Sequence, residues 1–311
     1  MTQVVALAGG VGGARLAHGL QAHLGADLTV VVNTADDTER HGLLVMPDHD
    51  TVMYTLAGLD NRELGWGLAG ETFAAAEVLE RYGEETWFRL GDRDLATHIV
   101  RTARLGRGER LTEVCRHLQH SLGVGAEILP MTDGAVRTEV RTDDGWLEFQ
   151  EYFVHRHQAP DVHEVRFKGV EATEATRDVT EAIATAGGLV VAPSNPIVSV
   201  APILAVPGLR AAIDAARARG VRIVAVSPIV GGRALKGPAD RMLRSLGHEA
   251  SAVGVARLYA DLVDVLVIDR ADAALAAAVE DLGMAPIVTD TIMVDDEARA
   301  RLAAEVLAAV G

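Results

Sequence analysis

The sequence predicts an α/β fold: a Rossmann-like, doubly wound, mostly parallel sheet with a small inserted α+β subdomain. Three observations predict it. The apolar run Val4–Ala8 is followed at once by four glycines in five positions and then by leucines at a spacing of four, which is the order strand, turn, helix. Strand and helix patterns alternate again after residue 170. Between residues 127 and 169 the pattern changes to short strands.

The first 126 residues predict two strands and five helices. The strands are Val4–Ala8 and Leu28–Val32, whose continuous apolar runs are typical of a parallel sheet covered on both faces. Asp50 or Thr51 is the expected N-cap of the second helix. Apolar residues at helical spacing predict helices over residues 12–24, 51–59, 71–82, 95–105 and 111–122.

Residues 127–169 are the expected inserted subdomain, between the two parts of a nucleotide-binding core, residues 1–126 and 170–311. Its expected strands are residues 128–130, 136–141, 146–149, 152–154 and 163–167, with a hairpin turn at Asp143-Asp144-Gly145. Three of the four aromatic residues Trp146, Phe149, Tyr152 and Phe153 are expected to pack a local core. The rest of the chain predicts strands at 188–192, 222–226, 265–268 and near Ile287, and helices at 171–186, 207–219, 255–262, 271–282 and 297–310.

Composition excludes several classes of partner. The chain has 29 Lys and Arg against 44 Asp and Glu, a net charge of −15, which argues against nucleic acid or an anionic membrane as the main partner. No apolar stretch approaches the ~20 residues of a membrane span, and the N-terminus lacks the pattern of a signal peptide. The single cysteine, Cys115, precludes an internal disulfide and fits a reducing compartment. We therefore expect a cytoplasmic protein that binds neither nucleic acid nor membrane.

The glycine-rich turn is a candidate phosphate site. Backbone N–H groups of Gly10, Gly12 and Gly13 would meet a phosphate at the N-terminus of the following helix. Arg15 stands where the dinucleotide fingerprint requires a third glycine, and no Gly-Lys-Ser/Thr follows, so neither that fingerprint nor a Walker A loop is present. The alternative is a tight strand–helix turn with no ligand, although one or two glycines would suffice for that.

Carboxylates gather after the second strand. Asn33, Asp36 and Asp37 follow the strand directly, and Asp48 and Asp50 come soon after. Ligands bind at strand ends in open α/β sheets, and Mg²⁺ is commonly held by one or two carboxylates together with phosphate oxygens. The two pairs of aspartates therefore suggest a Mg²⁺ site. The alternative is that these aspartates are helix caps or solvated loop charges and bind no ligand.

Two later turns also end apolar strands with small polar residues. They are Pro193-Ser194-Asn195-Pro196 and the segment from Ser227 to Gly232, and Lys236 adds a cation beside the second. A serine there could bond a phosphate or a base edge, or simply close its own turn. Arg89 precedes a further loop, Gly91-Asp92-Arg93-Asp94, which could also be an ordinary capped helix start.

Together these segments resemble the phospholactate transferases of deazaflavin coenzyme F(420) synthesis, the family called CofD in archaea and FbiA in actinobacteria. The resemblance rests on the motifs above together with Leu129-Pro130-Met131-Thr132-Asp133 and Phe149-Gln150, in order along the chain. It implies a Mg²⁺-dependent, homodimeric transferase. Such an enzyme moves a phospholactyl or phosphoenolpyruvyl group from a guanosine diphosphate ester to the ribityl hydroxyl of the deazaflavin precursor Fo, and releases GMP.

The resemblance also implies roles for individual residues. Asp50 and Arg89 would contact Fo, although some relatives have a lysine where Arg89 stands. Asp50 and Asp37 would be catalytic, and Asp36, Asp37 and Asp50 would surround the metal. The donor would be held by the remaining candidates: Gly10, Gly12 and Gly13 at the diphosphate, and Asn33, Ser194, Asn195, Ser227, Gly231 and Gly232 around the guanosine.

Other functions remain open at this point. A Rossmann oxidoreductase is disfavoured because the glycine pattern departs from its fingerprint. A non-catalytic regulator of the same superfamily that binds a nucleotide or nucleotide sugar is the main alternative. The three-carbon acid of the donor is not determined, because lactate, enolpyruvate and glycerate differ by small groups that only a pocket's shape distinguishes.

Overall fold

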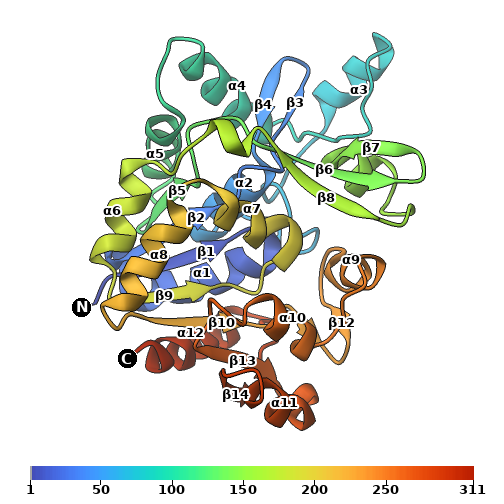
Figure 1. The fold of residues 1–311 in the computed structure, drawn as a ribbon. Helices are drawn as coiled ribbons and strands as arrows, with labels where there is room; N and C mark the ends of the chain where they lie inside the picture. The colour runs from blue at the N-terminus through green and yellow to red at the C-terminus, as the bar shows by residue number, and fades with distance from the viewer. Residues whose placement is uncertain (1) are drawn as a thin grey trace.

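A seven-stranded parallel sheet forms the centre of the protein (Figure 1). The structure is a computed structural model that describes residues 2–311. The sheet has the order β14-β13-β10-β9-β1-β2-β5, and every neighbouring pair is parallel. The predicted fold class is confirmed. The strands are β1 (Val4–Ala8), β2 (Leu28–Val32), β5 (Glu127–Pro130), β9 (Gly188–Val191), β10 (Arg222–Val226), β13 (Val265–Asp269) and β14 (Ala285–Thr289).

The strand order fixes where a ligand can bind. Counted along the chain within this sheet alone, the order is 3-2-1-4-5-6-7, which extends the Rossmann arrangement. The order reverses between β1 and β9, whose register places Val4 beside Gly188. Ligands of such sheets bind in the crevice beyond the carboxyl ends of the strands at this reversal. The turns that follow β1 and β9 are the predicted glycine and Pro-Ser-Asn-Pro segments.

Helices cover both faces of the sheet, so there are two hydrophobic cores. Strand β1 serves both, because Val4, Ala6 and Ala8 point to one core and Val5 and Leu7 to the other. One layer consists of α1 (Gly10–Leu24), α2 (Pro47–Leu56), α5 (Leu111–Ser121) and α12 (Asp296–Val310). The other consists of α6 (Arg177–Thr185), α7 (Ala201–Ala205), α8 (Leu209–Ala218), α10 (Ala252–Leu258) and α11 (Ala276–Glu280).

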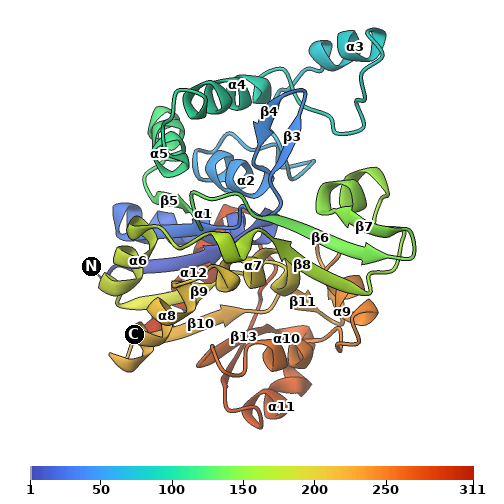
Figure 2. The same ribbon diagram turned by 45° about the horizontal axis from the view of Figure 1, so that its top comes forward.

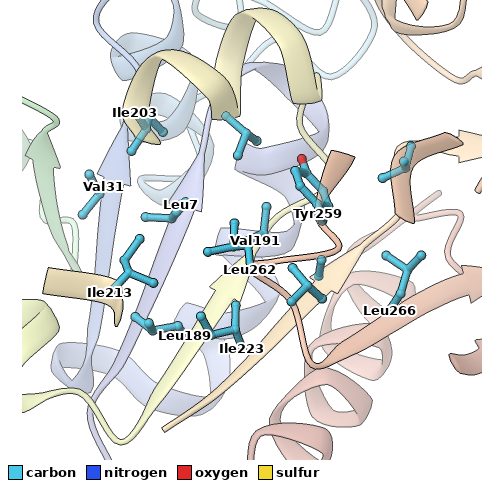
Figure 3. Close-up of a cluster of buried hydrophobic side chains, with 14 of the residues drawn as sticks. Leu7, Val31, Leu189, Val191, Ile203, Ile213, Ile223, Tyr259, Leu262 and Leu266 are labelled. Atoms are coloured by element: carbon cyan, nitrogen blue, oxygen red, sulfur yellow. The ribbon is translucent and has the colours of Figure 1, made fainter. Parts of the chain in front are cut away.

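The second of these cores is shown in Figure 3. Leu7 and Val191 from neighbouring strands meet Ile203 and Ile213 from the helices above them, and each is at most 2% exposed. Full burial of such a side chain contributes about 1.5–3 kcal/mol relative to its exposed state. The sheet and its helices therefore form a rigid base for the segments at the strand ends.

A separate three-stranded antiparallel sheet lies beyond these strand ends (Figure 2). It consists of β6 (Arg137–Thr142), β7 (Gly145–Glu148) and β8 (Glu164–Lys168). Asp143 and Asp144 form the predicted two-residue hairpin turn, with Gly145 at φ 100°. Phe149 and Tyr152 are buried in a local core, with Phe153 packed against it, as predicted; Met242 of α9 (Ala239–Ser245) joins this core.

Two expectations for this region are wrong. Residues 127–130, expected as the start of the insert, are strand β5 at the edge of the main sheet, where Ile128 pairs with Val30. Ile128 is fully buried, and this parallel pairing gives its apolar run a core that a small antiparallel sheet would not provide. Residues 152–154, expected as a strand, lie in a π-helical turn, Glu151–His155. That turn places Tyr152 in the local core, where burial outweighs its strand propensity.

The remaining elements are mostly short. They are the hairpin β3 (Thr38–Arg40) and β4 (Leu43–Val45), helices α3 (Ala74–Arg81) and α4 (Asp94–Leu105), the hairpin β11 (Ile229–Val230) and β12 (Arg233–Ala234), the π-helical turn Pro196–Val200, and the 3-10 turns Gly25–Asp27, Val170–Ala172 and Arg270–Leu275. Both hairpins, α7, α9 and the turn at Pro196 were not predicted. The helices expected at 171–186 and 271–282 are each divided into a 3-10 turn and a shorter helix, α6 and α11.

Within residues 2–311, no single helix is both long and apolar enough to cross a membrane. By length and composition alone, one bent pair passes the same criterion, Pro196–Ala205 with Leu209–Ala218, at an angle of 85°.

Candidate active site

One cavity of about 510 Å³ opens at the carboxyl ends of the parallel strands. The structure brings most of the predicted site residues to its wall. Those that line it are Gly10, Gly12, Asp36, Asp50, Arg89, Ser194, Asn195 and Ser227, and those that do not are Gly13, Asn33, Asp37, Gly231 and Gly232. The cavity therefore joins the glycine turn, the carboxylates and the two later turns, which are far apart in the sequence.

Close packing between the turns after β1 and β9 accounts for two of the glycines. A methyl group on Gly12 would overlap the Pro193 carbonyl oxygen, and one on Gly13 would lie 2.5 Å from Ser194 Oγ. That hydroxyl accepts a hydrogen bond from Gly9 N (2.9 Å) and donates one to Gly9 O (2.8 Å). Ser194 thus ties the two turns together beneath the cavity.

The Asp48 carboxylate is hydrogen-bonded to the glycine turn. Gly10 N–H donates to Asp48 Oδ1 at 2.8 Å, and Asn33 Nδ2 donates to Asp48 Oδ2 at 2.9 Å. Asn33 is fully buried and also bonds Val198 O at 3.2 Å, so its side chain holds Asp48 and does not face the cavity. The N–H of Gly10, expected to hold a phosphate, has a carboxylate as its partner in this structure.

Helix α2 begins at Pro47, four residues before the expected start, so the predicted N-cap at Asp50 or Thr51 is wrong. Proline suits the first turn of a helix because its missing N–H would have no partner there. Asp48 and Asp50 lie in the same turn, where the helix dipole favours negative charge. Both carboxylates therefore project from a helix end, which is more rigid than the loop that the sequence suggested.

Asp50 belongs to a buried charged network with α4. Arg101, fully buried, donates to Asp50 Oδ1, to Leu44 O (3.2 Å) and to His98 Nδ1 (3.1 Å). Burial alone would raise the pKa of Asp50, but the charge of Arg101 and the hydrogen bond from His49 outweigh it and hold this pKa below its ordinary value. Asp50 is therefore ionised at neutral pH and fixed in orientation.

The same network determines the proton position on His98. A guanidinium can only donate, so His98 Nδ1 accepts from Arg101 and the ring proton lies on Nε2. Nε2 is 3.3 Å from Asp94 Oδ2, and Asp94 Oδ1 accepts from the Tyr54 hydroxyl at 2.6 Å. Asp50, Asp94 and His98 bring ligand-type atoms within 4.8 Å of one another. His98 Nε2 and Asp50 Oδ2 are nevertheless buried without a hydrogen-bond partner, so hydrogen bonds do not account for every ligand-type atom of this group.

The three carboxylates expected around a metal each have an unsatisfied oxygen. Among the described residues, Asp36 Oδ1, Asp37 Oδ1 and Asp50 Oδ2 are buried and accept no hydrogen bond. Burial raises the pKa of Asp36, and the charge of Asp48 adds to the effect; burial also raises the pKa of Asp37, against the charges of Arg137 and Arg101. Buried carboxylate oxygens without partners suit a hard divalent cation. Within residues 2–311, however, the ligand-type atoms that lie within 4.8 Å of one another are those of Asp50, Asp94 and His98, so only Asp50 of the three expected ligands belongs to a group of that geometry, and the metal role of Asp36 and Asp37 stays a prediction.

The raised pKa of Asp48 predicts a specific pH dependence. Burial raises this pKa from 3.8 to about 6, against the hydrogen bonds from Asn33 and Gly10. Between these values the folded protein holds a proton that the unfolded chain has lost, so stability falls as pH rises from about 4 to 6 and is level above. Relative to Asp48→Asn, the wild type should lose on the order of 2 to 3 kcal/mol of unfolding free energy across this range. Denaturant titrations of both proteins at several pH values measure the difference, and a constant difference would contradict the prediction.

Besides Tyr54, five aromatic side chains form part of the cavity wall, here called the aromatic wall: Trp66, Trp87, Phe88, Phe149 and Phe153. Phe149 and Phe153 stack with ring centroids 5.4 Å apart, and the Arg40 guanidinium lies 4.2 Å from the centroid of Trp87. Arg89 lies over the ring of Phe73, 4.1 Å from its centroid. This wall suits a planar apolar ring system.

In the turns after β9 and β10, several polar groups that the sequence suggested as ligand contacts are hydrogen-bonded within the protein. Ser227 Oγ accepts from Ile229 N and donates to Ile229 O, so its hydroxyl closes its own turn. Asn195 Oδ1 accepts from Ile197 N, as the cap of the π-helical turn. Gly231 N–H donates to Asp272, and Gly232 O accepts from Arg244, away from the cavity. Their roles around a guanosine stay a prediction.

Sequence reasoning missed Arg101, Tyr54 and the aromatic wall. A signal for Arg101 was present: Asp94, His98 and Arg101 stand at positions i, i+4 and i+7, so they share one face of a predicted helix. Nothing comparable marks the wall, because its residues come from three separate segments. Only the fold brings them together.

Comparisons with known proteins identify the family. The family model described as 2-phospho-L-lactate transferase CofD matches residues 4–308. A protein of Kitasatospora aureofaciens named phosphoenolpyruvate transferase is 44% identical over 314 residues, covering 98% of this chain and 97% of its own. One of Methanosarcina acetivorans named 2-phospho-L-lactate transferase is 38% identical over 301 residues, covering 96% of each.

A solved structure supports the fold independently. The crystal structure of a UPF0052 family member from Bacillus halodurans has a TM-score of 0.65 and 16% sequence identity, and the match covers 98% of both chains. At this identity the likeness bears on the fold alone. The family match and the identities of 38% and 44% confirm the resemblance found in the sequence. The chain belongs to the 2-phospho-L-lactate transferase CofD family.

Proposed function

We propose that this protein transfers a phospho-three-carbon-acid group, phosphoenolpyruvyl or phospholactyl, from a guanosine diphosphate ester to Fo. The ribityl hydroxyl oxygen of Fo forms a bond to the phosphorus that bears the acid. The bond from that phosphorus to the oxygen of GMP breaks, GMP leaves, and the hydroxyl proton is released. The names of the relatives support the transferred group, because they are called phosphoenolpyruvate and 2-phospho-L-lactate transferases.

The observation that carries the proposal is one cavity lined by two chemically different sets of residues. The glycine turn and the carboxylates of Asp36 and Asp50 are one set, and aromatic side chains are the other. A transferase must hold a phosphate-bearing donor and a second substrate in contact. The polar residues suit the donor, and the aromatic rings suit the planar deazaflavin ring of Fo.

In this proposal the protein acts through position and charge more than through covalent chemistry. Phosphoryl-type transfer passes through a loose transition state that needs in-line alignment and charge neutralisation. Asp50, held ionised by Arg101, presents its free Oδ2 for the ribityl hydroxyl or the cation. Arg89 lines the cavity and would place a positive charge near Fo. Asp37 does not line the cavity, and its carboxyl group interacts electrostatically with Asp50.

Magnesium fits this arrangement as a proposed cofactor. Asp50 would hold it through its unsatisfied Oδ2, and Asp36 and Asp37 are the further ligands that the sequence predicts. When bound, Mg²⁺ supplies positive charge that offsets the phosphate charges of the donor. The homodimer implied by the family resemblance is also part of the proposal, and light scattering after size-exclusion chromatography tests it.

A product assay tests the proposed reaction. The purified protein is incubated with Fo, Mg²⁺ and, in turn, the guanosine diphosphate esters of phospholactate, phosphoenolpyruvate and phosphoglycerate. We expect one donor to yield GMP and a deazaflavin whose mass increases by that of the transferred group. Omission of Mg²⁺ should stop the reaction. If no donor reacts while Fo and GDP both bind, the protein is not this transferase.

A further inference from the structure

Basic side chains are few on the cavity wall. Four carboxylates line it, those of Asp36, Asp48, Asp50 and Asp94, against Arg15, Arg89 and Lys236. Arg15 reaches the Met293 carbonyl oxygen (3.4 Å), and Arg89 lies on the Phe73 ring. Within residues 2–311, the Lys236 ammonium has neither a hydrogen bond nor an ion pair. A donor with a diphosphate and a carboxylate therefore meets two cations that make no hydrogen bond within residues 2–311, Arg89 and Lys236, and of these only Arg89 is held by an aromatic ring.

Lys236 reaches the cavity from the loop between β12 and α9, and its ammonium borders Gly65. A methyl group placed on Gly65 would lie 3.7 Å from Lys236 Nζ and 3.6 Å from Val11 Cγ2. Val11 belongs to the first turn of α1, between Gly10 and Gly12. Gly65 therefore connects Lys236 to the segment predicted to meet the donor phosphates, although the two lie more than 220 residues apart in sequence.

The choice of lysine at this position is unusual for the chain. Of its 29 basic residues other than histidine, only Lys168 and Lys236 are lysines, and all others are arginines. Lys168 is on strand β8, where it pairs with Glu139 at 3.2 Å. An ammonium is a compact point charge with three donors that rotate, whereas a guanidinium is a rigid planar fork. A compact charge suits phosphate oxygens that are also approached by backbone N–H groups and a cation.

We propose that the Lys236 ammonium binds the diphosphate oxygens of the donor and is a substrate-binding residue of this site. The inference rests on the proposed function, because it assumes a donor that carries a diphosphate. Lys236 lines the same cavity as the carboxylates of α2. It offsets part of the repulsion between the donor and those carboxylates and fixes the diphosphate against the glycine turn.

The two lysines make a direct test of this contact possible in the wild-type protein. Lysines are acetylated with a limited amount of acetic anhydride, and acetylation of Lys236 and Lys168 is followed by mass spectrometry with Mg²⁺ and guanosine, GMP or GDP. GDP at about ten times its Kd should slow acetylation of Lys236 about tenfold, in proportion to its occupancy. Guanosine, which lacks phosphate, should not slow it. Lys168 is the internal control and should react equally in every sample.

Matched variants test the energetic contribution. Lys236→Ala should weaken GDP binding and raise the donor KM by about tenfold, the loss expected for one charge-assisted hydrogen bond. Lys236→Arg keeps the charge, so it should weaken GDP binding and raise the donor KM less than Lys236→Ala does. Lys168→Ala should match the wild type. The Fo KM should change little in all three, and added salt should weaken donor binding more in the wild type than in Lys236→Ala.

The outcomes separate this inference from the proposed function. Equal acetylation of Lys236 with and without saturating GDP, or a wild-type donor KM in Lys236→Ala, overturns the inference while transfer by the wild type still supports the function. If the wild type transfers nothing but GDP protects Lys236, the proposed reaction is wrong and the phosphate contact stands.

Discussion

Asp50→Asn is expected to lower the rate of transfer by about a thousandfold or more, the loss typical of removing a group that acts on the reacting atoms. The structure adds a second expected result, a loss of stability. Arg101 is fully buried and donates to the Asp50 carboxylate, so the substitution leaves a buried guanidinium without its counter-charge. Removing one partner of a buried ion pair costs about 3–5 kcal/mol. The sequence alone gave no reason to expect this cost, because Asp50 was placed in a loop.

Two further variants separate the two effects. Asp50→Asn/Arg101→Met removes both charges, so it should recover part of the lost stability while transfer stays absent. Asp143→Asn is the matched control: its side chain is 94% exposed at a hairpin turn, and neither activity nor unfolding should change. Activity is measured with saturating Mg²⁺ and Fo, and unfolding by denaturant titration. A folded Asp50→Asn protein with near-wild-type turnover would refute the role of Asp50.

The positions of the strand ends could be predicted because local patterns determine them. A continuous apolar run such as Val4–Ala8 needs cover on both faces, and glycines directly after it mark a sharp turn into a helix. The carboxyl ends of parallel strands share one edge of the sheet. The order of the chain therefore predicts that the glycine turn, Asp36 and Ser194 lie near one another.

The partners of these side chains could not be predicted from local pattern. Gly10 and Asp48 are separated by 38 residues and Tyr54 and Asp94 by 40, and their hydrogen bonds depend on how helices α1, α2 and α4 pack. Asn33 illustrates the consequence. Its position after β2 suggested a ligand contact, but its side chain is fully buried and orients Asp48. The sequence identified the segments of the site better than it identified the role of each side chain.

The glycines of the turn after β1 have a structural role in addition to the phosphate-binding role that the sequence suggests. Gly10 has φ +62°, which favours glycine whether or not a ligand binds, and Gly12 and Gly13 are required by contact with the turn after β9. These structural requirements and a role in phosphate binding are compatible, because the same close approach of β1 and β9 forms the crevice. The glycines are therefore needed because the turns after β1 and β9 pack closely together at the point where the strand order reverses.

Gly12→Ala tests how much of the protein's stability depends on the close packing of these two turns. The new methyl group would overlap the Pro193 carbonyl oxygen, a backbone atom that cannot rotate away, so the turns after β1 and β9 must separate. Such overpacking is expected to cost about 3 kcal/mol of unfolding free energy. Because the Ser194 hydrogen bonds to Gly9 span the same junction, donor binding should weaken as well, with less effect on Fo.

The control for Gly12→Ala is Gly106→Ala, at the end of α4. Gly106 has φ −62° and ψ −17°, and a methyl group there would lie 3.4 Å from its nearest neighbour, Thr102 O. Alanine fits this conformation and restricts the unfolded chain, so Gly106→Ala should be neutral or raise stability by about 0.4–1 kcal/mol. Denaturant titration and GDP binding are measured for both variants. If Gly12→Ala matched Gly106→Ala in both measurements, the junction between the turns would be looser than its contacts imply, and the rigid crevice on which donor binding depends would have to be abandoned.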